Sequence, residues 1–480
     1  MTSRSYEDQL KELTATVIDG RTKNVRYQQT QLLNLHAALS RKEDVICSAI
    51  STDTSGSNCE VAAEFFWTAD VVRRLFESID FEGDLENEYL VARNKDDLNR
   101  RCAIGLAVIR PTTHTRLYSI ISVLATAVAA GNCVLLELEP TILALDPILR
   151  EVITESLDQD AVKISSKKVD FSKLPTHIFV DQTNSLLRTI AVVDRTANID
   201  AAANAIVTAR QSFQGSSPFA PDLVIVNEFV KSRFIDSCTQ IASHISGIKP
   251  RENVSSNSSA DAKQVVRNAE LKGEILSFGL PDFKILDIRD RSSKIVKEKI
   301  GGTFLPIISS TSLIDAVSLI EPNVTFSAGY LFADPPSVKF LGQYLDCNLA
   351  FANHIPFHLL IGPVAPLSSE PSLPHRYNTR MFTDARPQVV TQSFDGSSEL
   401  SQALSAKFKS ADAEKISLYI RNLAVQHLKA PKRPLGHAIG FFEQGILTGL
   451  GIFLITTVVP PFAYGGWTFA KYWYEIYNRK

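Results

Sequence analysis

The cysteines of this chain lack the spacing that a metal site or a disulfide framework requires. They are Cys47, Cys59, Cys102, Cys133, Cys238 and Cys347. No C-x-x-C pair occurs among them, and that pair is the usual signature of a structural zinc site. We therefore expect no metal and a reducing compartment. Cys133 falls in an apolar strand-like run and Cys238 in an amphipathic helical run, so both are predicted to be core residues.

The sequence also lacks an excess of charge of either sign. Its 50 Lys and Arg residues nearly balance 52 Asp and Glu residues, which gives a formal net charge of −2. A nucleic-acid-binding domain normally carries a basic surplus, so no nucleic-acid partner is expected. The N-terminal residues, MTSRSYEDQL, are polar and charged, and we expect no secretory signal peptide there.

Charge is missing altogether from a long C-terminal stretch. Residues 444–470 contain no Asp, Glu, Lys or Arg, and Gly445–Val459 is almost continuously apolar. A membrane-spanning helix needs about 20 such residues. Residues 445–464 reach that length if the helix continues past Pro460 and Pro461, which we expect to kink the span or end its regular part.

The flanks of this stretch match those of a membrane anchor. Lys429, Lys432 and Arg433 precede it, and an aromatic end that includes Trp467 and Trp473 follows it. Basic residues favour the cytosolic side, and Trp and Tyr favour the membrane interface. We expect a cytosol-facing protein with a single-pass C-terminal anchor. The alternatives are a buried core helix and a hairpin that enters one leaflet.

Upstream of this tail, short apolar runs alternate with helical patterns. The first ~55 residues are predicted to be helical, with a capping box at Ser40–Glu43 opening one helix. The strand-like runs are Ala103–Ile109, Cys133–Leu138, Val162–Ser165, His177–Val180, Thr189–Asp194 and Leu223–Asn227. The helical runs between them are Thr115–Ala130, Ile142–Glu155 and Asp200–Ser212. Strands alternating with helices predict βαβ units and a parallel sheet.

The loop FQGSSPFAPD, residues 213–222, joins the last of these helices to the last strand. It resembles the nucleophile loop of the aldehyde dehydrogenase superfamily, whose usual form is G-Q-T-C-x-A-P-D. Gly215 and Ala220–Asp222 fit that pattern. The position of the catalytic cysteine is Pro218, which has no nucleophilic atom.

Further blocks resemble the same superfamily in order and spacing, over residues 20–390. They are IGLAVIRP (104–111), ATAVAAGNCVLLEL (125–138), GGTFLP (301–306), Ala352–His354, and Phe382 with Arg386–Pro387. The resemblance is closest to the short, membrane-anchored fatty aldehyde dehydrogenase class. It implies an α/β fold with a Rossmann-type parallel-sheet domain, a second α/β catalytic-type domain and a C-terminal membrane helix. The expected divisions are residues 1–196, 197–362, 363–436 (closing segment, oligomerisation strand and amphipathic helix) and 437–480 (anchor).

The resemblance also locates the catalytic positions, and each is altered. Oxidation through a covalent thiohemiacetal requires a thiolate nucleophile, and its position is Pro218. The general-base position is Asn184, whose amide cannot act as a base. The oxyanion position is Thr113, whose hydroxyl can still donate one hydrogen bond.

The cofactor positions implied by the resemblance are altered as well. Glu137 stands where the family places a lysine for the adenine ribose. Lys299 stands in place of the glutamate that holds the nicotinamide ribose, and Gly301 in place of the neighbouring phenylalanine. After the strand His177–Val180, the sequence lacks the G-S-T-x-x-G helix start that receives the pyrophosphate.

These changes predict a pseudoenzyme that binds no cofactor and has an interaction or scaffold role. The resemblance further implies a homodimer, or a heterodimer with an active relative. Two alternatives remain: a divergent NAD(P)-dependent oxidoreductase acting on fatty aldehydes, and a protein that binds a hydrophobic metabolite. His114, Ser217 and His354 are the residues expected to line any remaining pocket.

Overall fold

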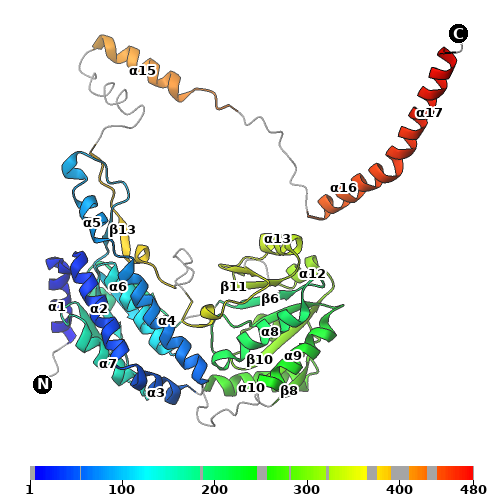
Figure 1. Cartoon of the computed structure of the whole chain (residues 1–480). Coiled ribbons are helices and arrows are strands. Elements are labelled where there is room, and N and C mark those ends of the chain that lie inside the picture. The colour runs from blue at the N-terminus through cyan, green and yellow to red at the C-terminus, as the bar shows by residue number, and fades with distance from the viewer. Residues whose placement is uncertain are drawn as a thin grey trace. The chain divides into compact units, whose positions relative to one another are not determined.

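A computed structural model of the chain describes residues 6–54, 56–183, 187–245, 257–280, 283–320, 324–364, 376–390, 410–429 and 441–478. The chain divides into two compact units, Met1–Thr391 and Gln392–Lys480. The first unit holds both central β-sheets (Figure 1). The second unit contains the membrane-anchor candidate.

The N-terminal region is helical, as the sequence predicts. Its helices are α1 (Tyr6–Asp19), α2 (Val25–Arg41), α3 (Glu43–Asp53), α4 (Asn58–Glu77) and α5 (Phe81–Glu88). The capping box predicted at Ser40–Glu43 is wrong, because α3 begins after Lys42 without a side-chain cap. The capping box instead opens α4, where the Ser57 and Glu60 side chains satisfy each other's backbone N–H groups.

The first sheet has four parallel strands in the order β4-β3-β2-β5. They are β2 (Leu106–Arg110), β3 (Cys133–Glu137), β4 (Val162–Ser165) and β5 (His177–Asp181). Helices α6 (Arg116–Ala129) and α7 (Leu145–Ser156) make the crossovers. Strands covered on both faces read as continuous apolar runs, and the bounds predicted for β3 and β4 match within one residue. The run predicted as Ala103–Ile109 begins three residues before β2.

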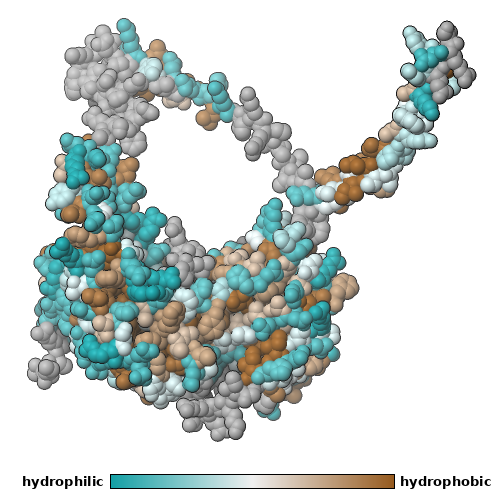
Figure 2. All heavy atoms as spheres, in the orientation of Figure 1, coloured by the Kyte–Doolittle hydropathy of each residue, from teal (hydrophilic) through white to brown (hydrophobic). Residues whose placement is uncertain are grey.

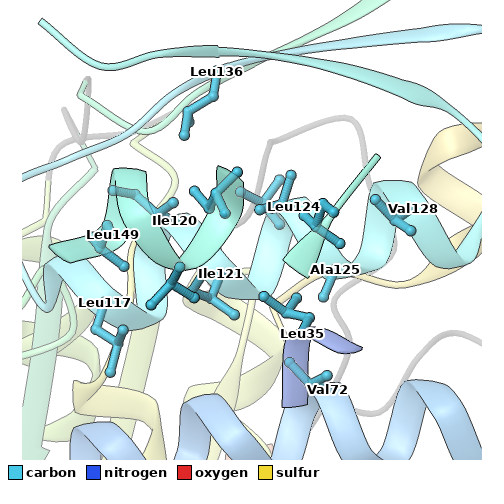
Figure 3. Packing of buried hydrophobic residues seen from close by; sticks show 14 of the residues in the cluster. Leu35, Val72, Leu117, Ile120, Ile121, Leu124, Ala125, Val128, Leu136 and Leu149 are labelled. Atoms are coloured by element: carbon cyan, nitrogen blue, oxygen red, sulfur yellow. The ribbon is translucent and has the colours of Figure 1, made fainter. Parts of the chain in front are cut away.

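Helix α6 lies at the centre of the first core. All of its residues are buried, because α2, α4 and the sheet all contact it. Figure 3 shows Leu117, Ile121 and Leu124 of this helix among side chains from α2 and α4, including Leu35 and Val72. A helix that is apolar all round must be buried on all sides. The position of its N-terminus is therefore fixed by packing.

The second sheet has seven strands in the order β12-β11-β6-β7-β10-β9-β8, all parallel except the edge strand β8. They are β6 (Thr189–Val193), β7 (Leu223–Asn227), β8 (Ile275–Leu280), β9 (Phe283–Ile288), β10 (Phe304–Ser310), β11 (Ala328–Phe332) and β12 (Ala350–Ala352). Its helices are α8 (Ile199–Gln211), α9 (Lys231–Ile245), α10 (Asn257–Leu271), α11 (Lys294–Lys297), α12 (Leu313–Ser318) and α13 (Pro335–Tyr344).

The expected domain boundary at residue 196 needs correction. Strand β6 precedes that boundary, yet it pairs with β7 and β11 inside the second sheet. The two sheets are therefore divided between the end of β5, at Asp181, and the start of β6, at Thr189. The sequence pattern could not locate this division, because both sheets consist of parallel apolar strands.

The segment after residue 375 returns to the first sheet's side of the unit. Strand β13 (Thr383–Ala385) pairs antiparallel with β1 (Arg101–Ala103), and Phe382 is fully buried in the first core. The amphipathic helix expected before the tail is α15 (Ser410–Ala424). Residues 391–409, within the expected oligomerisation segment, lie outside the described part of the chain.

The tail forms one helical stretch, Glu443–Tyr474, that is long and apolar enough to cross a membrane by length and composition. It lies within the continuous run of α16 (Phe441–Phe453), a π-helical turn at Leu454–Val458, and α17 (Val459–Tyr477). The helix does not end at Pro460 and Pro461. The π-turn precedes these prolines, whose missing N–H groups interrupt the regular ladder. Figure 2 shows the most hydrophobic surface of this stretch on α16.

Candidate functional site

The loop that resembles a nucleophile loop connects α8 to β7 in a strained conformation. Three consecutive residues have positive φ: Phe213 (50°), Gln214 (55°) and Gly215 (67°). Non-glycine residues rarely adopt such angles, and they persist only where surrounding contacts fix them. One such contact comes from the Glu60 carboxylate, which accepts a hydrogen bond from the Phe213 backbone N–H at 2.7 Å.

Gly215 is required at its position by close backbone packing. A Cβ atom there would lie 2.2 Å from the carbonyl oxygen of Gly302. We expect Gly215→Ala to lower the free energy of unfolding by roughly 2–5 kcal/mol, from positive φ combined with steric overlap. Gly301→Ala is the matched control, since a Cβ at Gly301 meets no atom within 4 Å. Denaturant unfolding should show little change for the control, and equal losses would contradict this assignment.

Pro218 and Ser217 are both buried within the loop. The Pro218 carbonyl accepts a hydrogen bond from the Thr189 hydroxyl at 3.0 Å. The Ser217 hydroxyl accepts one from the Phe219 backbone N–H at 3.2 Å. Ser217 therefore supports the turn and, with a side chain only 1% exposed, is inaccessible to a substrate.

The end of the loop is fixed by a buried ion pair that the sequence analysis missed. Arg210, from the last turn of α8, lies 3.2 Å from Asp222 and also donates to the carbonyls of Phe304 and Ile300. Lys299 lies 3.5 Å from the same carboxylate. The lysine expected at a cofactor position is thus paired with Asp222 of the loop.

His114 reaches the loop from the β2–α6 connection. Its Nδ1 lies 3.0 Å from the Ser216 hydroxyl, and its Nε2 lies 2.9 Å from the Leu360 carbonyl oxygen. Burial is the main cause that lowers the pKa of His114 to about 4, and the charges of Arg376 and Lys299 add to it. The imidazole is therefore neutral at pH 7, and the structure brings His114 and the loop together as one site.

The expected oxyanion position and the remaining expected pocket residue are both at the surface. Thr113, at the oxyanion position, is exposed beside His114. His354 is also exposed, and its Nδ1–H donates to the Ala352 carbonyl at 2.9 Å at the end of its own strand. The ring of His358 lies 5.4 Å from that of Trp67.

At the carboxyl edge of the first sheet, three charged residues are paired with one another. Arg110, Glu137 and Asp181 are the last residues of β2, β3 and β5. Arg110 contacts Glu137 at 2.5 Å and Asp181 at 3.3 Å. Glu137 also accepts the Val169 backbone N–H at 2.7 Å. In parallel α/β sheets this edge is where ligands bind, and here it presents two carboxylates around one guanidinium.

Two helix N-termini at this edge are occupied by protein carboxylates. Glu64 of α4 accepts from the backbone N–H groups of Leu117 and Tyr118 in α6, at 2.9 and 3.4 Å. Burial raises the pKa of Glu64 to about 7, although these hydrogen bonds oppose the shift. Asp53 of α3 accepts from Ala144 and Leu145 at the start of α7, at 2.7 and 2.9 Å. Backbone N–H groups of this kind hold phosphates in dinucleotide-binding folds.

The strand β5 leads to no such helix. Only residues 182–188 separate it from β6, and those of them that the structure describes are not helical. Asn184 lies outside the described residues. Gln182 is buried and donates to the Ser119 carbonyl and the Tyr377 hydroxyl at 2.8 and 2.9 Å. At this edge, the described N–H donors of α6 and α7 are thus already paired with protein carboxylates.

Sequence reasoning missed Glu64, Asp53 and Arg210. Glu64 interrupts the buried face of α4 near Val61 and Val71, and a carboxylate on an apolar helix face is a signal that it has a buried partner. Asp53 has no comparable signal, because it is the last residue of α3. Their partners lie 53 and 91 residues away or more along the chain, so no local pattern identifies them.

Comparisons with known proteins agree with this architecture. No family model matches the chain. The chain is 22% identical over 367 residues to aldehyde dehydrogenase family 3 member B1 of Rattus norvegicus, covering 68% of this chain and 78% of that protein.

The solved structures that resemble this chain include aldehyde dehydrogenases as well. One described as the substrate-bound state of Staphylococcus aureus AldH has a TM-score of 0.64 at 18% identity, covering 84% of this chain and all of that one. The NADP-dependent glyceraldehyde-3-phosphate dehydrogenase of Bacillus halodurans, complexed with NADP, has a TM-score of 0.63 at 12% identity, covering 80% and 90%. The chain is thus an aldehyde dehydrogenase-like protein with the fold of that superfamily.

Proposed function

We propose that this protein is a membrane-anchored aldehyde dehydrogenase-like protein that does not carry out NAD(P)-dependent aldehyde oxidation and serves as an interaction or scaffold subunit. The observation that carries the proposal is the carboxyl edge of the first sheet. Glu64 and Asp53 occupy the N-termini of α6 and α7. A dinucleotide would bring two phosphates to groups that already bind carboxylates, so like charges would compete for the same N–H donors.

The nucleophile loop supports the same proposal independently of the cofactor. Pro218 has no nucleophilic atom, and its carbonyl is bonded to Thr189 inside the protein. A hydride leaves readily only from a covalent tetrahedral adduct. Loss of the thiolate therefore removes the chemical step, and loss of the phosphate sites removes the hydride acceptor.

An interaction role also needs surfaces and a location. The edge strand β8 leaves Leu276 and Phe278 exposed, at 39% and 41%, and an exposed apolar edge strand is suited to pairing with another chain. Such pairing would give the expected homodimer, or a heterodimer with an active relative. The stretch Glu443–Tyr474 would hold that assembly on a membrane, with the first unit facing the cytosol.

A titration of NAD⁺ and NADP⁺ into the full-length protein in detergent micelles tests the proposal. We expect no saturable binding by calorimetry or by fluorescence of the reduced cofactor. An active aldehyde dehydrogenase in the same detergent serves as the positive control. Saturable binding in the micromolar range, together with turnover of a long-chain aldehyde, would refute the loss of oxidation.

A further inference from the structure

We propose that Ser216 and His114 form a serine–histidine dyad that accepts the acyl group of an ester with an apolar acyl chain. This activity goes beyond the function proposed above, because it needs neither a thiolate nor a nucleotide. It stands on an accessible hydroxyl, a base beside it, groups that orient the base, and an apolar surface next to both. Ser217, the hydroxyl that the sequence drew attention to, is buried and is not the nucleophile.

The hydrogen bonds of His114 determine which nitrogen can act as a base. The Leu360 carbonyl can only accept, so Nε2, at 2.9 Å from it, carries the proton. In the neutral ring Nδ1 then has a free lone pair. The Ser216 hydroxyl lies 3.0 Å from Nδ1, within the range required of a general base and its nucleophile. The hydroxyl also reaches the Phe213 carbonyl at 2.6 Å, which is the alternative acceptor for its one proton.

The surrounding backbone fixes the positions of both His114 and Ser216. The Leu360 carbonyl occupies the role that a carboxylate has in a Ser-His-Asp triad, fixing the tautomer and the ring plane. Arg376 in turn donates to the neighbouring carbonyls of Leu359 and Ile361. On the other side, the strained backbone of Phe213–Gly215 presents Ser216 at the exposed end of the turn. A nucleophile on a strained turn is a recurrent arrangement in acyl-transfer enzymes.

The surroundings of the dyad favour an apolar acyl group. The ring of Phe213 lies 5.6 Å from that of His114, and the ring of Phe357 lies 6.1 Å from Phe213. Phe357 is 41% exposed. Aromatic rings beside an accessible nucleophile offer contact area to a hydrocarbon chain.

The reaction balances without a redox partner. The Ser216 Oγ attacks the ester carbonyl, the new C–Oγ bond forms, and the hydroxyl proton passes to His114 Nδ1. The C–O bond to the leaving alcohol breaks, and the alcohol takes the proton from Nδ1. Water then attacks the acyl-serine carbonyl and gives a proton to the same nitrogen. The C–Oγ bond breaks, Ser216 Oγ takes that proton back, and the carboxylic acid is released. Because the pKa of His114 is lowered to about 4, the ring is a weak base, and the acyl-serine should form slowly.

A fluorophosphonate carrying a long alkyl chain tests the dyad on the full-length protein in micelles. The probe forms a P–Oγ bond with an activated serine and releases fluoride. We expect labelling of native protein, abolished by heat denaturation, and mass spectrometry of its peptides should find the adduct on Ser216. Ser216→Ala should lose the label. His114→Gln should slow labelling about 100-fold or more, as expected for loss of a general base.

Ser232→Ala is the matched control, because Ser232 is an exposed serine on α9, and it should label like the wild type. Absence of label from native protein, or an adduct elsewhere than Ser216, would overturn the dyad. Peptide mapping of the wild type makes this decision even if a loop variant fails to fold. Saturable NAD⁺ binding with turnover of a long-chain aldehyde would refute the proposed function and leave the dyad standing, so the two failures are distinguishable.

Discussion

Pro218→Cys should not give this protein NAD(P)-dependent aldehyde oxidation. The substitution restores a thiol at the family's nucleophile position, but the hydride formed from a thiohemiacetal still needs an acceptor. The Glu64 and Asp53 carboxylates accept the N–H groups at the N-termini of α6 and α7. Arg110 is paired with Glu137 and Asp181. We expect no aldehyde-dependent formation of NADH or NADPH above the wild-type background, as measured by absorbance.

The matched control for this variant is Ser216→Cys, which places a thiol at the exposed position of the same loop. Both thiols should be confirmed by alkylation and mass spectrometry before the assay. Neither variant should produce reduced cofactor from a fatty aldehyde. A Pro218→Cys protein that reduces NAD⁺ at a rate typical of enzymes, about 1 s⁻¹ or faster, would show that the cofactor site is functional.

Truncation after residue 436 should move the protein from the membrane fraction to the soluble fraction. The stretch Glu443–Tyr474 has no burial inside the protein, so its apolar side chains, among them Ile452 and Ile455, contact solvent unless a membrane covers them. Fractionation of cells, followed by alkaline extraction of the membranes, measures the change. A truncated protein that stays in the extracted membranes would contradict the anchor.

A substitution in the full-length chain separates the effect of hydrophobicity from that of length. Ile452→Lys combined with Ile455→Lys places two charges near the middle of the stretch, each at a cost of about 3 kcal/mol for insertion. We expect this variant to be extractable. The control is Leu418→Lys combined with Tyr419→Lys on α15, two exposed positions outside the stretch, which should leave the protein in the membrane.

Sequence reasoning located the elements of the fold well where burial is complete. The strand β3 is fully buried and was predicted within one residue of its bounds, and β4 and β7 were predicted at their observed bounds. Continuous burial produces continuous apolar sequence, and the glycine at residue 131 marks the end of α6 through its positive φ. The comparisons with known proteins confirmed the α/β class and the likeness to aldehyde dehydrogenases.

The contacts made by the site residues could be predicted from the sequence less well than the fold. The resemblance identified Pro218, Glu137 and Lys299 as altered positions. It could not predict which contacts these residues make in this protein. Glu137 pairs with Arg110, and Lys299 with Asp222, across separations that carry no periodic signal. His114 was expected in a pocket, whereas its partner, Ser216, could be identified only from the three-dimensional structure.

The pairing of β1 with β13 has a consequence for the order in which the chain can fold. Arg101–Ala103 meets Thr383–Ala385, and Asn132 donates to the Phe382 carbonyl at 2.9 Å inside the first core. The core built from the earliest residues is therefore incomplete until almost the whole of the first unit has been synthesised. The second sheet, β6 to β12, needs no residue beyond Ala352 for its strand pairing. During synthesis the seven-stranded sheet can therefore complete its strand pairing before Phe382 and the β1–β13 pair close the first core.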